Sequence, residues 1–365
     1  MIRKADSLEV FISDTRIGRM IENAEGIVFF EYDIDWLKQG FSISPFYLPL
    51  KPGVFKAKRD PFNGLFGVFN DSLPDSWGNL LIDRLLMKNG VNPKSLSQID
   101  RLSIVGSNGM GALSYKPDNS FKNYDDICDI RFFATEIKKV LNEENDGSLE
   151  LLINKNGSSG GARPKIMLQV NNEHWLIKFP HSSDPNNIGK TEYKYSLCAK
   201  KCGIEMPETR LFEKKYFGIK RFDVVGTQRF HVHSASGLLY ADYRLPSLDY
   251  TELGKATWAL TQNIQEVYKV FRLMVFNVLT ENKDDHSRNF SFIFTDNNWE
   301  FAPAYDLTPG YGINNNHSTT IAGKGNPSKN DIFEVAKILG IQPKQADTIF
   351  DDVYENSAEI RKVKF

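Results

Sequence analysis

The feature that most limits how this chain can fold is a change in the spacing of its apolar residues near Gly237. From residue 8 up to this point, short runs alternate apolar and polar side chains, as β-strands do, between turns rich in proline and glycine. Beyond it, apolar residues recur at helical spacing over 250–262, 264–279 and 331–339. Strands that precede helices in this way predict an α+β fold.

Breaks in composition divide the chain into three predicted parts. Residues 1–115 form a β-rich N-terminal subdomain, which one helix over 75–89 interrupts. Residues 116–236 begin with a polar stretch that holds a connector helix and continue as a β-rich lobe with a glycine-rich loop. Residues 237–365 form an all-helical lobe. We therefore expect two lobes after the N-terminal subdomain, one made of strands and one made of helices.

Composition bounds the possible partners and the compartment. The 45 basic and 46 acidic residues leave a net charge of −1, so bulk electrostatics demands neither nucleic acid nor an anionic membrane. No apolar run is long enough for a transmembrane helix, and the N-terminus lacks the apolar core of a signal peptide, which predicts a cytoplasmic protein without a membrane partner. Cys128, Cys198 and Cys202 form no disulfide framework, and the last two are predicted core residues.

A polar motif near the C-terminus carries the chemistry. Asp284 is followed five residues later by Asn289, and Asp306 comes after a short strand-like stretch. Carboxylate and amide oxygens suit Mg²⁺, which neutralises a phosphoryl group in transfer, so Asn289 and Asp306 are candidate metal ligands. Asp284 is placed to accept the proton of an attacking hydroxyl. The alternative is that these residues are ordinary turn formers and helix caps.

Two upstream segments add to this pattern. A loop at 157–165 contains three glycines, which allow the backbone to approach phosphate oxygens, although the loop would also serve as a plain hairpin turn. Lys178 lies in the apolar strand that follows, where protein kinases place the lysine that holds the α- and β-phosphates. Glu192, in the next helical segment, is its candidate carboxylate partner. The alternative is an edge strand whose lysine faces solvent. Together these parts predict a two-lobed, protein-kinase-like fold.

The sequence resembles the HipA-like serine/threonine kinases, which are toxins of bacterial toxin–antitoxin modules. The resemblance covers nearly the whole chain and runs in the family's order. It is carried by the segments NDSLPDSWG at 70–78, SSGGARPK at 158–165, IKF at 177–179, IKRFD at 219–223, DDHSRN at 284–289 and AYDL at 304–307.

The resemblance implies ATP and Mg²⁺ as cofactors and assigns roles to several residues. Asp284 is the proton acceptor, Asn289 and Asp306 are the metal ligands, and the segment 231–235 is the hinge whose backbone binds adenine. Ser158, with Ser159 beside it, matches the serine that the family phosphorylates in its own loop to switch itself off. The implied nucleotide-binding set is Gly160, Gly161, Ala162, Arg163, Pro164, Lys165, Lys178, His233, Ser234, Ala235, His286, Asn289, Tyr305 and Asp306.

Two features depart from the family pattern. Arg163 and Pro164 stand where the best-known pattern has Gln and Glu, and His233 replaces an acidic residue that is common in the hinge. His286 lies inside the catalytic loop and is expected to support that loop. His231 and His233 alternate along a strand, which is also compatible with a metal pair, though a hinge strand is the simpler interpretation.

The resemblance also implies partners. These are an antitoxin of the HipB type with a helix-turn-helix, operator DNA contacted only through that antitoxin, and a cytosolic protein substrate such as an aminoacyl-tRNA synthetase, whose phosphorylation arrests translation. Two alternatives stay open at this point. One is a catalytically silent co-repressor that keeps the fold, and the other is a small-molecule phosphotransferase with an acidic pocket for cationic substrates.

Overall fold

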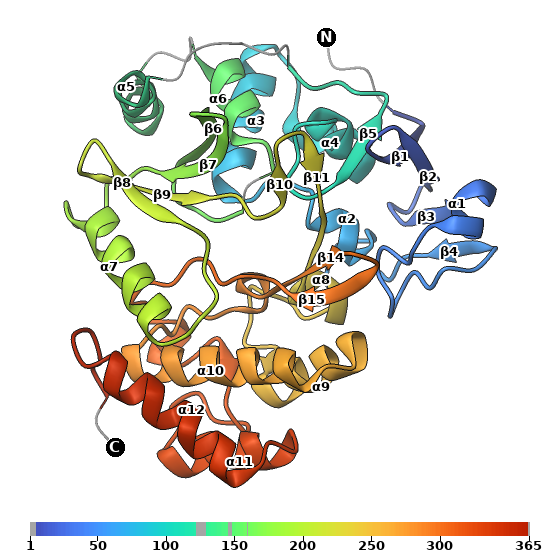
Figure 1. Cartoon of the computed structure of the whole chain (residues 1–365). Helices are drawn as coiled ribbons and strands as arrows, with labels where there is room; N and C mark the ends of the chain where they lie inside the picture. The colour runs from blue at the N-terminus through green and yellow to red at the C-terminus, as the bar shows by residue number, and fades with distance from the viewer. Residues whose placement is uncertain (1–4, 122–128, 145–147, 159, 364–365) are drawn as a thin grey trace. The chain divides into compact units, whose positions relative to one another are not determined.

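The chain forms two compact units whose segments alternate along the sequence. The computed structural model describes residues 5–121, 129–144, 148–158 and 160–363. The first unit comprises residues 1–190 and 210–231, and the second comprises residues 191–209 and 232–365. The boundaries fall inside three elements, α7 (Ile188–Lys201), β8 (Thr209–Phe212) and β12 (His231–Ser234), of which the first two are labelled in Figure 1. The three-part division at residues 115 and 236 differs from these units, because residues 191–209 and 232–236 of the predicted middle part fall in the second unit, and it stays a prediction.

The first unit begins with a five-stranded antiparallel sheet in the order β4-β3-β2-β1-β5. Leu8 and Val10 of β1 are fully buried, whereas Glu9 between them lies opposite Arg19 of β2 and Lys116 of β5. This alternation is the period of two that the sequence predicts. The strands are β1 (Ser7–Ile12), β2 (Thr15–Glu22), β3 (Val28–Tyr32), β4 (Val54–Lys56) and β5 (Leu113–Lys116).

More helices accompany this sheet than the single one predicted. The predicted helix is α3 (Ser76–Lys88), which Asp75 caps at its start and Asn89 at its end. Also present are α1 (Ile34–Gln39), α2 (Gly67–Asn70), a 3-10 turn (Pro93–Ser95) and α4 (Gln98–Val105). The prediction of only one helix was wrong because segments of four to eight residues are too short to display a helical period.

The rest of the first unit is a four-stranded sheet with two helices. The sheet has the order β6-β7-β9-β8, and it shares a core with α3, α5 and α6 in which Trp77, Ile166 and Trp175 are buried. The elements are α5 (Ile130–Leu141), α6 (Leu149–Asn156), β6 (Lys165–Val170), β7 (Glu173–Lys178), β9 (Tyr216–Lys220), β10 (Val224–Val225) and β11 (Gln228–Arg229). The predicted connector helix is confirmed as α5.

The second unit is mainly helical. Its elements include α8 (Ala235–Leu239), α9 (Tyr250–Thr261), α10 (Ile264–Thr280), α11 (Lys329–Ile338) and α12 (Pro343–Asn356). Of these, α9, α10 and α11 match the three predicted helices, whereas α8 and α12 were not predicted. Figure 1 shows α10 lying beside α9 and α12. Asp331 is the third residue of α11 rather than its cap, since Ser328 caps the helix and bonds with Asp331 in a capping box.

This unit is not all-helical, which corrects one part of the predicted fold. It holds a three-stranded sheet in the order β12-β14-β15 and a parallel pair of β13 (Leu248–Asp249) and β16 (Thr319–Thr320). The strands β14 (Ser291–Thr295) and β15 (Asn298–Phe301) form the hairpin that separates the two parts of the polar motif. The α+β fold class itself is confirmed.

The core of the second unit joins residues from α7, α9, α10, α11 and α12. Cys198 and Cys202 lie in it, as predicted, and their thiols contact the backbone carbonyls of Asn356 and Val353. Both cysteines are free. Among the residues that the structure describes, no helix has the length and apolar character needed to cross a membrane.

Asp223 makes the first unit sensitive to acid. Its buried carboxylate accepts hydrogen bonds from Arg221 at 2.9 and 2.6 Å and from the backbone N–H of Gly111 at 2.7 Å. Burial by itself raises the pKa of Asp223, but Arg221, the Gly111 N–H and Arg229 outweigh it and lower that pKa below its ordinary value. A lowered pKa stabilises the fold above the pKa of the unfolded chain, and this stabilisation is lost as the pH falls through the folded value.

We expect the urea midpoint of the wild-type protein to fall as the pH drops below about 4, the ordinary pKa of an aspartate in an unfolded chain. Asp223→Asn should lower the midpoint at pH 6 and flatten the acid loss, because asparagine cannot ionise. The exposed carboxylate of Asp14 provides the matched control, and Asp14→Asn should follow the wild type at every pH. An Asp223→Asn protein with the wild-type acid profile would show that another carboxylate controls this transition.

Candidate active site

The loop between α10 and β14 holds the first part of the polar motif. Asp284 is exposed, and its backbone carbonyl accepts a hydrogen bond from Nδ2 of Asn289 at 2.8 Å. Residues Ser287–Asn289 form one 3-10 turn, which brings the amide back toward the start of the loop. A Cβ on Gly310 would lie 2.9 Å from Cβ of Asp284, so only glycine fits beside that aspartate without a shift. The loop therefore presents the Asp284 carboxylate to solvent and fixes its backbone.

Asp285, the next residue, points the other way and anchors the loop. Its fully buried carboxylate accepts hydrogen bonds from the Tyr250 hydroxyl, from His317 Nδ1 and from the Ser318 backbone N–H, each at 2.9 Å. The Thr319 N–H adds a bond at 3.3 Å, and the Thr319 hydroxyl donates to the Asp285 carbonyl at 2.6 Å. A carboxylate with this many donors is strongly held.

The network continues into the helices. Nδ2 of Asn277 on α10 donates to the Tyr250 hydroxyl at 2.9 Å, and Nδ2 of Asn282 donates to Oδ1 of Asn277 at 3.0 Å. Burial, followed by the Asp285 carboxylate, raises the pKa of Tyr250 well above its ordinary value, so its hydroxyl stays a donor at neutral pH. The loop is thereby tied to α9 and α10 through buried polar side chains.

Asp306 lies on the segment that follows β15. Its φ is +57°, in the left-handed region, which aspartate tolerates better than most residues and which is frequent at functional sites. The neighbouring Tyr305 hydroxyl bonds to the Arg288 carbonyl at 2.9 Å and to the Ser291 hydroxyl at 2.6 Å. The turn that carries Asp306 is therefore attached to the loop that carries Asn289.

The residues of this loop pair fit a magnesium ion. Because Nδ2 of Asn289 is used by the Asp284 carbonyl, its Oδ1 is left as the acceptor, and Asp306 offers a partly exposed carboxylate. Magnesium in nucleotide sites takes one or two protein oxygens and completes its shell with phosphates and water. Among the described residues no group of three or more His, Cys, Asp or Glu side chains has the geometry of a metal site.

In the first unit, the glycine-rich loop is fixed by the cap of α3. The Asp75 carboxylate accepts the N–H of Ser76 and the N–H of Gly161, both at 2.9 Å. The Lys165 ammonium donates to the Gly160 carbonyl. The sequence analysis missed this role of Asp75, because the two bonded residues are 86 positions apart.

The other loop residues have partners of their own. Nε of Arg163 bonds to both carboxylate oxygens of Asp184, at 3.1 and 3.0 Å. The Ser158 hydroxyl is buried and accepts the backbone N–H of Met110 at 2.7 Å. Ser159, the second predicted phosphorylation site, lies outside the described residues. Phosphorylation of Ser158 would require this hydroxyl to leave its present position.

Lys178 ends strand β7, opposite Lys165 of β6. Its side chain is largely buried, and Nζ lies 5.6 Å from the centroid of the Phe217 ring. Glu192, its predicted partner, is buried in α7 and belongs to the second unit. The pairing of Lys178 with Glu192 therefore stays a prediction, whereas the alternative of a solvent-facing lysine on an edge strand is wrong, because β7 lies between β6 and β9.

The predicted hinge is the strand β12 and the start of α8. His233, Ser234 and Ala235 are all buried, and the Ser234 hydroxyl caps α8 by accepting the Gly237 N–H at 3.0 Å. The N–H of Ala235 donates to the Phe290 carbonyl at 2.8 Å. An adenine at this segment would have to bond to backbone groups other than the Ala235 N–H.

His286 is half-buried, and its ring lies 6.0 Å from the ring of Tyr243. The Arg288 guanidinium lies 5.1 Å from the centroid of the same tyrosine ring. The expected role of His286 in supporting the loop stays a prediction. His231, in the first unit, bonds through Nε2 to the Ile43 carbonyl at 2.8 Å.

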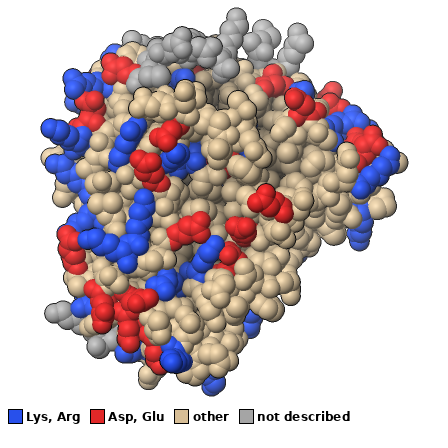
Figure 2. Space-filling model, viewed as in Figure 1, with Lys and Arg blue, Asp and Glu red and all other residues tan. Residues whose placement is uncertain are grey.

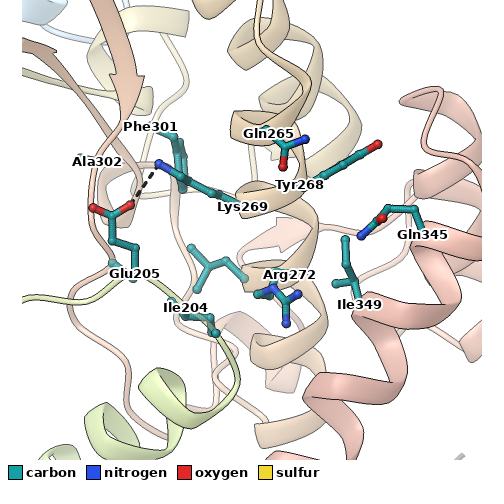
Figure 3. A pocket seen from close by; sticks show the side chains of 13 residues that line it. Ile204, Glu205, Gln265, Tyr268, Lys269, Arg272, Phe301, Ala302, Gln345 and Ile349 are labelled. Carbon is teal, nitrogen blue, oxygen red and sulfur yellow. Dashed lines mark ion pairs between the residues drawn. The ribbon is translucent and has the colours of Figure 1, made fainter. Parts of the chain in front are cut away.

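A cavity of about 220 Å³ lies beside the Asp306 segment within the second unit (Figure 3). Ala302 and Ala304 line one side of it, and α10 lines another. The Lys269 ammonium lies 3.0 Å from both Glu205 and Glu266. Because the Lys269 ammonium is already paired with these two carboxylates, we do not assign an anion-binding role to the cavity.

Of the predicted site residues, the second unit brings together Asp284, His286, Asn289, Tyr305 and Asp306. The first unit groups the glycine-rich loop, Lys165 and Lys178 at the adjoining ends of β6 and β7. The loops that flank the β14–β15 hairpin carry a solvent-facing carboxylate, an amide and a second carboxylate. Together with the α+β architecture, in which strands precede helices along the chain, these features define the kinase-like class of fold.

Comparison with known families identifies the chain more closely. Residues 157–360, more than half of the chain, match the model of the HipA-like C-terminal domain, and residues 8–116 match that of the HipA N-terminal domain. The chain therefore belongs to the HipA family.

Individual relatives are distant in sequence. The chain is 24% identical over 284 residues to a putative kinase of Sinorhizobium fredii, an alignment that spans 70% of this chain and 68% of the relative. It is 26% identical over 178 residues to a putative kinase of Haemophilus influenzae, spanning 41% of this chain and 52% of that protein. The HipA chain in the complex of HipA, HipB and operator DNA from Shewanella oneidensis has the same fold, with a TM-score of 0.70, 18% identity, and coverage of 98% of this chain and 92% of that one.

Proposed function

We propose that this protein is an ATP-dependent serine/threonine protein kinase and the toxin of a HipBA-type module. The observation that carries the proposal is the loop at 284–289, where Asp284 is presented to solvent while Asp285 is clamped in the core. A site that must hold one carboxylate in a fixed position near a reacting hydroxyl needs this combination of exposure and rigid support. The two relatives described above are both named as putative kinases, which supports the proposal.

The chemistry assigned to the second unit is a single displacement. The hydroxyl oxygen of a serine or threonine bonds to the γ-phosphorus of ATP, the bond from that phosphorus to the β,γ-bridging oxygen breaks, and ADP leaves with the electron pair. Asp284 accepts the hydroxyl proton. Asn289 and Asp306 would hold Mg²⁺, which supplies positive charge to the phosphate oxygens when it is bound.

The proposed nucleotide-binding residues come from both units, and the proposed regulatory serine comes from the first. Lys178 and the loop Gly160–Lys165 of the first unit would contact the phosphates. The hinge residues His233 to Ala235 of the second unit would contact adenine. Ser158 is the proposed site of self-phosphorylation. Since its hydroxyl accepts the Met110 N–H in a buried position, this event would need a rearranged loop.

The proposed partners are an antitoxin of the HipB type and a cytosolic protein substrate, for example an aminoacyl-tRNA synthetase. A HipA of this fold is known in complex with HipB and operator DNA. On the face of the molecule shown in Figure 2, basic and acidic side chains are interspersed, and the whole chain has a net charge of −1. We therefore place DNA contact in the antitoxin and the complex in the cytoplasm.

The proposal is tested by the intact mass of phosphatase-treated protein after incubation with Mg²⁺-ATP. We expect the wild type to gain one phosphoryl group, mapped to Ser158 or Ser159, and Asp306→Asn to gain none, because the variant loses the charged metal ligand. Fluorescence titration with an ATP analogue should show that Asp306→Asn still binds nucleotide without Mg²⁺.

Two outcomes would contradict the proposal. Equal mass gain in the wild type and in Asp306→Asn would remove Asp306 from the site. If the protein binds nucleotide but transfers no phosphate to itself, to cytosolic proteins or to aminoglycosides, the silent co-repressor would be the remaining function. If it turns over ATP with an aminoglycoside alone, it would be the small-molecule phosphotransferase.

A further inference from the structure

A six-residue loop projects beside Asp284 from two firm attachments to the catalytic loop. At its start, Gly310 forms a parallel β-bridge with Asn282, accepting the Lys283 N–H and donating to the Glu281 carbonyl, both at 3.2 Å. At its end, the Ser318 N–H and hydroxyl both donate to the Lys283 carbonyl at 3.0 Å. We call the intervening residues 311–316 the presentation loop.

The conformation of the presentation loop is restricted. Gly312, Asn314 and Asn315 have φ values of +56°, +53° and +59°, in the left-handed region that glycine and asparagine occupy most readily. A Cβ on Gly312 would collide with the carbonyls of Asn316 and Lys283, so the backbone is closely packed there. Lys283 also donates to the Asn315 side chain at 3.1 Å. The presentation loop therefore has a defined backbone conformation.

This preformed loop carries two exposed apolar side chains. Tyr311 is 86% exposed, the highest value for a large hydrophobic side chain in the described part of the chain, and Ile313 is 42% exposed. Tyr311 directly follows Gly310, the residue that packs against Cβ of Asp284. Apolar side chains held in water next to a reacting group gain free energy when a ligand covers them.

The charge of the loop bears on the kind of ligand. The presentation loop itself contains no aspartate, glutamate, lysine or arginine, and the nearby carboxylates of Asp284 and Asp306 belong to the proposed catalytic site. The loop therefore offers no ion pair to a polycation, whereas an apolar residue of a polypeptide needs none. An exposed tyrosine is also a favourable contact residue for polypeptides, because it buries a large area and orders few torsions.

We propose that Tyr311 and Ile313 dock an apolar side chain that flanks the acceptor serine or threonine of a protein substrate. The inference rests on the proposed kinase function and adds a specificity determinant to it. The tyrosine contributes its ring as the main contact, and the two attachments at Gly310 and Ser318 keep that contact in register with Asp284.

The experiment measures phosphate transfer to phosphatase-treated, heat-inactivated bacterial cytosolic protein at saturating Mg²⁺-ATP, as a function of extract concentration. For Tyr311→Asn and Ile313→Asn we expect the half-saturating extract concentration to rise about tenfold or more, with a much smaller change in maximal rate. Mapped wild-type sites should have an apolar residue beside the acceptor. The matched control is Trp258→Gln, which changes an exposed aromatic residue on α9 and should stay within about twofold of the wild type.

The outcomes separate the inference from the function on which it rests. Half-saturating concentrations within about twofold of wild type for both loop variants would overturn the docking role and leave the kinase intact. We expect Asp284→Asn to transfer no phosphate to the extract. If the wild-type protein also transfers none, both the docking role and the kinase function would be overturned. Because Tyr311 is so exposed, its replacement should not affect folding, and an unchanged thermal midpoint would confirm this.

Discussion

Replacing Asp284 by asparagine should lower the rate of phosphoryl transfer by a factor of about 10²–10⁴, the usual contribution of a general base. The two side chains have nearly the same shape, so the variant removes the proton acceptor without a change in side-chain volume. Because Asp284 is exposed and Asn289 bonds to its backbone carbonyl rather than to its side chain, the loop should keep its conformation.

The measurement is the initial rate of transfer from labelled ATP, together with the urea midpoint and the nucleotide affinity. The matched control is Asp347→Asn, which removes an exposed carboxylate on α12 and should leave all three quantities unchanged. If Asp284→Asn retains the wild-type rate, another group accepts the proton. If it unfolds, the exposed position of Asp284 is wrong.

Asp285→Ala should destabilise the protein by about 3–5 kcal/mol, although Asp285 is adjacent to Asp284 and has the same chemistry. The truncation leaves the Tyr250 hydroxyl, His317 Nδ1 and the Ser318 N–H buried without their acceptor. Transfer should also be lost, because the loop that carries Asp284 and Asn289 loses its anchor.

Urea unfolding, followed by circular dichroism, measures this loss, and Asp285→Asn tests its cause. Asparagine keeps one acceptor oxygen but presents two donors to partners that already donate, so we expect an intermediate loss of stability. Transfer by Asp285→Asn should recover in part when the protein is assayed at low temperature, where the folded form is populated. Equal stability of Asp285→Ala and wild type would show that the network around Tyr250 and His317 contributes nothing to the fold.

These two adjacent aspartates show how far the sequence predicts the site. The spacing of five to Asn289 selected Asp284, and the structure agrees in leaving it exposed. Nothing in the sequence indicated that Asp285 would be buried, since the residues that hold it lie 32–35 positions away. The spacing of apolar residues along the sequence indicates local structure. The hydrogen bonds of Asp285 depend instead on which distant segments meet in the folded chain.

The same distinction explains the fold. The helices α9 and α10, which have a strong period, were predicted almost to the residue, and the predicted bounds of α3 were also close to the observed ones. α6 was not predicted, since eight residues around polar Asn154 and Lys155 give little pattern. The strands β13 and β16 have two residues each and exist only through tertiary pairing, so the sequence does not indicate them.

The alternating order of the two units has a consequence for synthesis of the chain. Helix α7 is made before residues 210–231 complete the first unit, yet Tyr195 and Cys198 pack in a core that also needs Phe350 and Val353 of α12. These core partners of α7 exist only after α12 has been synthesised. We therefore expect nascent chains that lack α12 to be inactive in phosphate transfer.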